Sequence, residues 1–369
     1  MIEPATQPIS LRRVLRRVDA GAISANTRLF RSIVGANCQV MGVVKANAYG
    51  HGAVPAAQAM LDGGATQLGV ATIGEGLQLR VAGVNVPVLV LGAILGDEIA
   101  QALAYDLALA IGDHATLEQV AATARSMGRV ARCQLQIDTG MHRLGLLPHE
   151  VLPLLDAPAA RTIDWAGIFT HFACADEPWR PETHAQIACF DTLVGALRAA
   201  GWRFPVMHAA RSAGALAFPT ARYDLVRPGI ALFGVAPSAD LPLPAGFQPA
   251  LTCSTPIVRI ATLPAGSAVS YGGSYVTPGP RRIATLAAGY ADGLRRAPAW
   301  RAVLIGGQSA SIIGRICMDA AMADISAIPD VHVGDEAVLL GNQGAASIRA
   351  DEAAAWLGTS AYEVLTSLG

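Results

Sequence analysis

Short apolar runs alternate with helical patterns between Gln39 and Gly234. The eight apolar runs read QVMGVVKA, QLGVATI, PVLVLGA, LALAIG, RCQLQID, TIDWAGIFTH, FPVMHAA and DLVRPGIALFG. Segments such as TLEQVAATARSMG, with apolar residues at helical spacing, separate them. Strands that are apolar throughout and alternate with helices are typical of parallel sheets covered by helices. The pattern predicts the α/β class and a (β/α)8 barrel of the TIM type, with a doubly wound open sheet as the alternative.

The pattern of apolar and polar residues changes after Gly234. A proline-rich stretch without periodicity, residues 236–249, is typical of a linker. From Leu251 onward, short strands broken by Gly and Pro predict a mainly antiparallel β domain, with a short helix near Ala350–Leu357 and a short last strand. The early segment RRVDAG is strand-like and is expected to pair with this domain. We therefore expect an N-terminal segment (1–20), a barrel (21–240) and a β-rich domain (241–369).

Composition excludes several classes of protein. The net charge of −1 and the pI of about 6.7 leave no basic stripe for nucleic acid. The longest apolar run, Pro87–Gly96, is shorter than the roughly 18 residues of a membrane-spanning helix. The first residues lack the apolar core and cleavage site of a secretory signal. The six cysteines form no CxxC pair, so we expect no metal site, no disulfides and a cytoplasmic location.

Reactive groups of such barrels collect at the carboxyl ends of the strands. The polar residues at or just after the apolar runs are Lys45, Glu75, Asp138, Arg143, His171, Arg211, Ser212 and Arg227. Lys45 is the only lysine among 27 lysine and arginine residues, and it ends a buried strand. An amine, unlike a guanidinium, can lose its proton near neutral pH and form a Schiff base. Lys45 is therefore the leading candidate for a reactive residue. The alternative is that Lys45 is an ordinary surface lysine.

The segment VVKANAYGHG around Lys45 closely resembles the cofactor-binding signature of alanine racemases. Further resemblances follow in the family's order: DTGMHRLG, THFACAD, RSAGAL, VRPGIALFG, VSYGGSY, GYADGL, IGRICMD and AYEVL. Together they span most of the chain. The resemblance implies that Lys45 holds pyridoxal 5'-phosphate and that the enzyme interconverts L- and D-alanine. The D-alanine would be made for peptidoglycan or would be degraded.

The resemblance also implies how the cofactor is held. Its phosphate would contact Tyr49, Ser212, Gly229, Ile230 and Tyr362. His171 would lie against the pyridine ring, and the guanidinium of Arg227 would face the ring nitrogen. A guanidinium donates a hydrogen bond but scarcely gives up its proton. The ring nitrogen would then stay largely unprotonated, which suits racemisation better than transamination.

The substrate side of the site is implied by the same motifs. Arg143 would bind the alanine carboxylate with its planar fork. Tyr271 would come from the partner subunit and act as the acid/base on the face opposite Lys45, so a homodimer with shared active sites is expected. Because a free phenol has a pKa of about 10, nearby cations would have to stabilise its phenolate. The residues Met318 and Asp319 would also cross to the partner's site, and Tyr290 and Arg296 would line its entrance.

Two positions depart from the family pattern. Gln136 stands where many members carry a carbamylated lysine, so we expect a neutral acceptor for Arg143, supplemented by an anion such as chloride. Arg211 stands where asparagine is usual, which leaves the substrate range open. The alternatives are a racemase of this scaffold for serine or a larger amino acid, a decarboxylase, a non-catalytic carrier of pyridoxal phosphate, and a cofactor-free Schiff-base aldolase.

Overall fold

The structure is a computed structural model that describes residues 13–368. The chain divides into two compact units. The first, residues 19–250, is called the barrel unit here, and the second, residues 13–18 with 251–368, is called the β-rich unit. The beginning of the expected N-terminal segment, residues 1–12, and the expectation of no secretory signal lie outside the described residues.

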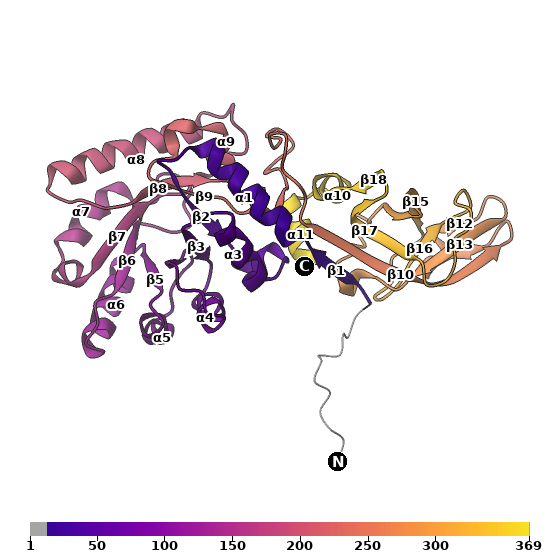
Figure 1. Cartoon of the computed structure of the whole chain (residues 1–369), viewed down its shortest axis with the longest axis horizontal. Coiled ribbons are helices and arrows are strands. Elements are labelled where there is room, and N and C mark those ends of the chain that lie inside the picture. The colour runs from indigo at the N-terminus through magenta and orange to yellow at the C-terminus, as the bar shows by residue number, and fades with distance from the viewer. Residues whose placement is uncertain (1–12, 369) are drawn as a thin grey trace, which may run out of the picture. The chain divides into compact units, whose positions relative to one another are not determined.

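The barrel unit contains a closed barrel of parallel strands, which Figure 1 shows surrounded by helices. The eight strands are β2 (Gln39–Val43), β3 (Gln67–Val70), β4 (Val88–Val90), β5 (Ala108–Ile111), β6 (Arg132–Gln136), β7 (Asp164–Phe169), β8 (Met207–Arg211) and β9 (Leu225–Arg227). Strands follow one another around the barrel in chain order, and β9 pairs with β2 to close it. The (β/α)8 prediction is confirmed, and the open sheet is excluded.

The first helix of this unit precedes β2, and the others follow strands. The helices are α1 (Ala20–Val34), α2 (Lys45–Tyr49), α3 (Ala53–Asp62), α4 (Ile73–Val81), α5 (Ile99–Ala104), α6 (His114–Ser126), α7 (Pro148–Asp156), α8 (Glu182–Ala199) and α9 (Ser212–Ala217). Asp19, Thr72 and Asp113 cap α1, α4 and α6 with their side chains. Asp113 starts α6 by accepting the Thr116 N–H at 2.7 Å. Among residues 13–368, no helix is both long and apolar enough to cross a membrane.

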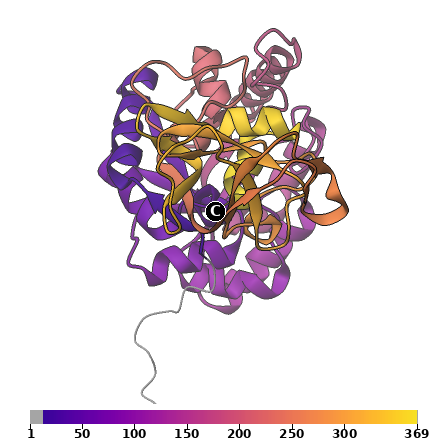
Figure 2. The same ribbon diagram turned by 90° about the vertical axis from the view of Figure 1, so that its right-hand side faces the viewer.

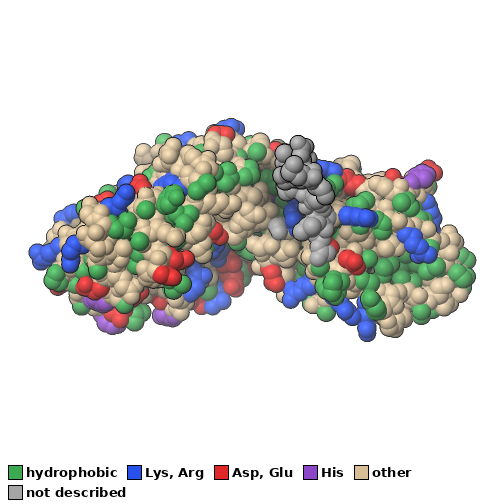
Figure 3. All heavy atoms as spheres, turned by 90° about the horizontal axis from the view of Figure 1, so that it is seen from below, with side chains coloured by type: hydrophobic (Ala, Val, Ile, Leu, Met, Phe, Trp, Pro, Cys, Tyr) green, Lys and Arg blue, Asp and Glu red, His purple; other side chains and the backbone are tan. Residues whose placement is uncertain are grey.

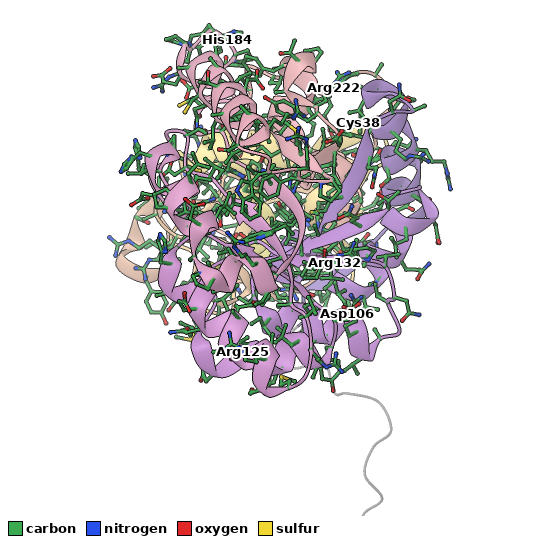
Figure 4. All side chains as sticks on the ribbon, turned by 90° about the vertical axis from the view of Figure 1, so that its left-hand side faces the viewer. Cys38, Asp106, Arg125, Arg132, His184 and Arg222 are labelled. Atoms are coloured by element: carbon green, nitrogen blue, oxygen red, sulfur yellow. The ribbon has the colours of Figure 1, made fainter. Side chains whose placement is uncertain are left out.

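The two ends of the barrel differ in what they carry. Figure 4 looks onto the amino ends of the strands, where Cys38, Asp106 and Arg222 precede β2, β5 and β9. Arg132 begins β6 at the same end and faces Asp164 at 3.9 Å. The candidate site residues follow the carboxyl ends of the strands. They therefore lie at the opposite end of the barrel.

The last apolar run of the barrel is not a single strand. Only Leu225–Arg227 is a strand, and Ile230–Phe233 forms the short 3-10 helix η4. Pro228 interrupts the strand because it has no N–H for the ladder. The chain then turns at Gly229, so that a helix start replaces a strand at the carboxyl end of the barrel.

The β-rich unit contains an eight-stranded antiparallel sheet and a separate pair of strands, β11 (Ala268–Val269) and β12 (Tyr275–Val276). The strands of the sheet are β1 (Leu15–Val18), β10 (Leu251–Leu263), β13 (Arg281–Leu286), β14 (Ala302–Ile305), β15 (Gln308–Ile313), β16 (Ala321–Asp324), β17 (Glu336–Gln343) and β18 (Ala346–Ile348). From β10 onward the strands are orange and yellow in Figure 2. β1 pairs antiparallel with β10, which also pairs with β13 and β17. The expected antiparallel β fold of this part of the chain is confirmed.

The chain ends in helices. The expected helix is present as α10 (Ala350–Leu357), but the expected short last strand is wrong, because its place is taken by α11 (Ala361–Leu368). The buried residues of α11 are Ala361, Val364, Leu365 and Leu368. This spacing of three and four residues fits a helix and not a strand. Tyr362 is therefore a helical residue.

The predicted linker has no regular structure, but a buried asparagine holds it. Asn26, on α1, donates to the carbonyls of Leu232 (3.1 Å) and Gln248 (2.8 Å) and accepts the Gln248 N–H (2.9 Å). The two bonds to Gln248 fasten the stretch to α1, and the bond to Leu232 ties α1 to the end of the last apolar run.

We predict that Asn26→Ala lowers the free energy of unfolding by about 3 kcal/mol, because three buried hydrogen bonds to the backbone are lost. Urea unfolding of both proteins measures the difference. As a matched control, Ser32→Ala removes one exposed bond from the same helix (to the Leu29 carbonyl, 2.7 Å) and should change stability by less than about 0.5 kcal/mol. Equal effects of the two substitutions would contradict the prediction.

Candidate active site

The carboxyl end of the barrel gathers several positive charges. Lys45 follows β2, Arg143 follows β6, and Arg211 and Arg227 end β8 and β9. Burial is the main cause that lowers the pKa of the Lys45 amine. The positive charges of Arg143, Arg211 and Arg227 lower that pKa further, and the negative charge of Glu75 raises it. The sole lysine is thus closer to its neutral, nucleophilic form than a surface lysine.

Arg227 is the most firmly held of these cations. Its side chain is 2% exposed, and its Nη2 donates to the carbonyls of Thr170 (2.7 Å) and Ala209 (2.8 Å). Its Nη1 donates to Nδ1 of His208 at 2.5 Å. Burial lowers the pKa of Arg227 to about 9, which still leaves it charged at neutral pH.

His208 and Gln134 complete this network inside the barrel. Nε2–H of His208 donates to Oε1 of Gln134 at 2.5 Å, and both side chains are buried. Burial, and then Arg227, lower the pKa of His208 well below its usual value, so the ring is neutral. With Nδ1 accepting from a cation, the proton must sit on Nε2. Neither residue was predicted from the sequence, where each is a polar residue inside a barrel strand.

His171 lies beside Arg227. Its Nδ1 is 3.4 Å from Nη2 of Arg227. Burial lowers the pKa of His171, and Arg227, Arg211, Arg143 and Lys45 lower it further. A neutral imidazole is therefore available at this position.

Ser212, Gly229 and Tyr49 meet at one point. Ser212 starts α9, is 1% exposed, and its Oγ accepts the N–H groups of Gly229 (3.1 Å) and Ala231 (3.3 Å). A Cβ at Gly229 would collide with the hydroxyl of Tyr49, so that hydroxyl lies against the Gly229 backbone. Ile230, the first residue of η4, follows directly. Two hydroxyls and two helix starts thus face one another.

The backbone between Lys45 and Gly50 has an uncommon conformation that the sequence did not predict. Ala46, Asn47, Ala48 and Tyr49 have φ of 52°, 52°, 54° and 54°, so they form a left-handed turn without glycine. Each such residue costs roughly 1–2 kcal/mol. The surroundings must offset this cost, and such strain is typical of functional sites.

The loop that carries Arg143 is organised by Asp138. Its Oδ1 accepts the N–H groups of Gly140 (2.9 Å), Met141 (2.9 Å) and His142 (3.1 Å). Burial acts to raise the pKa of Asp138, but these donors outweigh it and lower that pKa below its usual value. The carboxylate stays charged and fixes the loop, while Arg143 itself is exposed.

The two departures from the family pattern occupy different environments. Gln136 is buried, and no hydrogen bond joins it to Arg143 anywhere in residues 13–368. Arg211 pairs with Asp176 at 2.5 Å. The charge of Arg211 therefore has a carboxylate partner beside the site.

The β-rich unit carries a second group of candidate residues. A cavity of about 500 Å³ is lined by Tyr271, Gly272, Tyr290, Arg296, Arg315, Cys317, Met318 and Asp319. Four residues named from three separate motifs thus meet in one place, and sequence reasoning missed Arg315. Tyr271 is 67% exposed. Tyr362 lies on α11 of the same unit.

Comparisons with known proteins agree with this arrangement. The family model for the alanine racemase N-terminal domain matches residues 18–237, and that for the C-terminal domain matches residues 250–369. The chain belongs to the alanine racemase family. It is thus related to isomerases, and its two units correspond to the two domains that the family models describe.

Individual relatives are similar over nearly the whole chain. Alanine racemase of Desulforamulus reducens is 40% identical over 95% of this chain and 95% of its own. The crystal structure of the Streptomyces lavendulae alanine racemase has a TM-score of 0.92 at 38% identity and covers 98% of this chain and 96% of its own. That from Bartonella henselae, described with covalently bound pyridoxal phosphate, has a TM-score of 0.87 at 28% identity, covering 97% of each chain.

We predict that the apoprotein loses stability as the pH falls from about 7 to about 5. Burial lowers the pKa of His51 to about 4 and, as the main cause, lowers those of His171 and His208 well below their usual 6.5. In this pH range these histidines bind protons in the unfolded chain but not in the folded protein. Each histidine should remove about 2 kcal/mol over this range, and the loss should cease above the unfolded pKa. Urea unfolding at each pH measures it.

The exposed His114 is the control, because His114→Gln should leave the slope of stability against pH unchanged. A stability that is constant between about pH 7 and about pH 5 would contradict the assignment of neutral, buried rings.

Proposed function

We propose that this protein interconverts L-alanine and D-alanine, using pyridoxal 5'-phosphate bound at the carboxyl end of the barrel and two acid/base groups, Lys45 and Tyr271. The observation that carries the proposal is the environment of Lys45. The chain's only lysine has a lowered pKa among three arginines at the carboxyl end of the barrel. A primary amine in that state is suited both to hold an aldehyde covalently and to exchange a proton.

The residues present fit this cofactor. A phosphate needs hydrogen-bond donors in a positive field, and the site offers the hydroxyls of Ser212 and Tyr49 beside Gly229 and the start of η4 at Ile230. Tyr362 is the further phosphate contact that the resemblance suggests. Bound there, pyridoxal phosphate supplies a conjugated ring that accepts the electron pair left by the α-proton.

Arg227 and His171 act on the ring side of the site. We assign Arg227 to the ring nitrogen, where its guanidinium, charged at neutral pH, donates a hydrogen bond and keeps its proton. Its fixed position follows from its bonds to His208 and two carbonyls. His171, neutral and beside Arg227, is suited to pack against the ring without adding charge.

Racemisation needs a proton removed from one face of the α-carbon and one delivered to the other. Lys45 Nζ serves one face and Tyr271 Oη serves the other. Arg143 binds the substrate carboxylate and so fixes which faces are presented. Arg296 and Arg315 line the same cavity as Tyr271.

The remaining assignments concern the shape of the site. Met318 contacts the substrate, and Tyr290 and Asp319 narrow the approach along the cavity they share with Tyr271. Gln136 is an uncharged, buried neighbour of the loop that carries Arg143, in place of a negatively charged group. The pairing of Arg211 with Asp176 reduces the effect of its extra charge on the substrate.

We further propose that the protein is a homodimer in which Tyr271 and Met318 complete the partner's site. The β-rich unit exposes large apolar side chains, and Figure 3 shows hydrophobic side chains gathered on one face of it. The large apolar side chains that this unit exposes include Tyr271 (67% exposed), Met318 (56%), Val276 (54%) and Tyr290 (41%). Exposed apolar patches of this kind mark interaction surfaces. The product D-alanine would serve peptidoglycan synthesis, or the reverse direction would degrade it.

We predict that the purified holoenzyme forms D-alanine from L-alanine and that Lys45→Ala lowers this rate by about 10³-fold or more, since both the covalent attachment and one proton acceptor are lost. Chiral chromatography after incubation with each L-amino acid measures it. Arg125→Ala, at the opposite end of the barrel (Figure 4), is the control and should leave the rate unchanged. Racemisation of serine or a larger amino acid without D-alanine formation would overturn the substrate assignment.

A further inference from the structure

The left-handed turn Ala46–Tyr49 joins two groups of the proposed site. Lys45 precedes the turn, and Tyr49 is its last residue. The handedness of the turn therefore sets where the tyrosine hydroxyl lies relative to the amine. Four consecutive residues other than glycine keep this conformation only when contacts with the surrounding structure offset its strain.

Glu75 holds the start of the turn. Its Oε1 accepts the N–H of Ala46 at 2.7 Å, and its Oε2 accepts the N–H of Ala71 at 2.7 Å. The backbone of Glu75 is itself fixed, since its N–H donates to the Thr72 hydroxyl at the start of α4. The carboxylate thus ties the peptide after Lys45 to the end of the neighbouring strand β3.

His51 holds the end of the turn. Its Nδ1 lies 3.0 Å from the carbonyl oxygen of Ala48 and 3.1 Å from that of Tyr49. Because both partners are acceptors, Nδ1 must carry the proton. Burial lowers the pKa of His51 to about 4, so the ring stays neutral in this tautomer. The ring stacks on Phe233 with centroids 4.1 Å apart, and Phe233 also packs against Tyr49 at 5.3 Å.

We propose that His51 is a positioning residue: its Nδ1–H, with Glu75 at the other end, locks the turn in the left-handed form and thereby keeps the Tyr49 hydroxyl against the Gly229 backbone. Without this donor the turn relaxes, and the hydroxyl leaves the place where an anion would be bound. The link to cofactor binding rests on the proposed function, whereas the lock on the backbone does not.

Two variants separate the donor from the ring. His51→Phe keeps an aromatic ring on Phe233 but has no N–H. His51→Asn keeps an N–H donor at the position of Nδ1 and loses most of the ring. A role for the donor predicts that the asparagine variant resembles the wild type and that the phenylalanine variant does not. A role in packing alone predicts the reverse.

The first measurement is amide hydrogen exchange of the apoprotein over residues 46–52. The protected N–H groups there include those of Ala48 and Gly50, bonded at 2.8 and 3.1 Å to Val44 and Ala46. His51→Phe should speed exchange at least about tenfold in this segment, while residues 207–211 keep their rates, and His51→Asn should change it by less than about threefold. Unchanged exchange in His51→Phe would overturn the proposal.

The second measurement compares the affinity of the apoprotein for pyridoxal phosphate and for pyridoxal, followed by visible absorbance. His51→Phe should reduce the preference for the phosphorylated form at least about tenfold, because the Tyr49 hydroxyl is displaced, whereas a general loss of stability would weaken both ligands alike. An unchanged preference would overturn the positioning role. If the wild type bound neither compound, the proposed cofactor would be wrong. The hydrogen-exchange result would then decide whether His51 holds the left-handed turn.

Discussion

The buried charge of Arg227 is the constraint on which the candidate site depends. A guanidinium in a barrel interior is tolerated only with acceptors on every side. Here those acceptors are two backbone carbonyls and His208, which in turn donates to Gln134. The network forces His208 to be neutral and aims the cation at the carboxyl end of the barrel. Burial is the main cause of the lowered pKa of Lys45, and the charges of three arginines, Arg227 among them, add to it, while Glu75 opposes them.

Much of the fold could be predicted because its signals are periodic. Eight apolar runs separated by helical segments indicated the barrel, and short strands broken by Gly and Pro indicated the β-rich unit. The run through Pro228 was different, since a proline and a glycine within an apolar segment changed a strand into η4. The end of the chain was misjudged because its helical spacing spans only eight residues of α11.

The candidate site was predictable to the extent that its residues stand at strand ends or in motifs. Lys45, His171, Ser212 and Arg227 were found in this way, and the structure brings them to one end of the barrel. His208 and Gln134 could not be found, because a polar residue inside a strand gives no hint of its partner. The left-handed turn after Lys45 was equally hidden, because ANAY has ordinary helical propensity and the turn's handedness is set by contacts with Glu75 and His51.

The central claim is that Lys45 and Tyr271, which belong to different units of the chain, complete one site across a dimer. Mixing and refolding equal amounts of the inactive variants Lys45→Ala and Tyr271→Phe tests it most directly. Half of the resulting dimers would be mixed, and each would hold one intact site, so about one quarter of the wild-type activity should return. Activity that stays at the level of the separate variants, in a mixture shown to contain mixed dimers, would contradict the account.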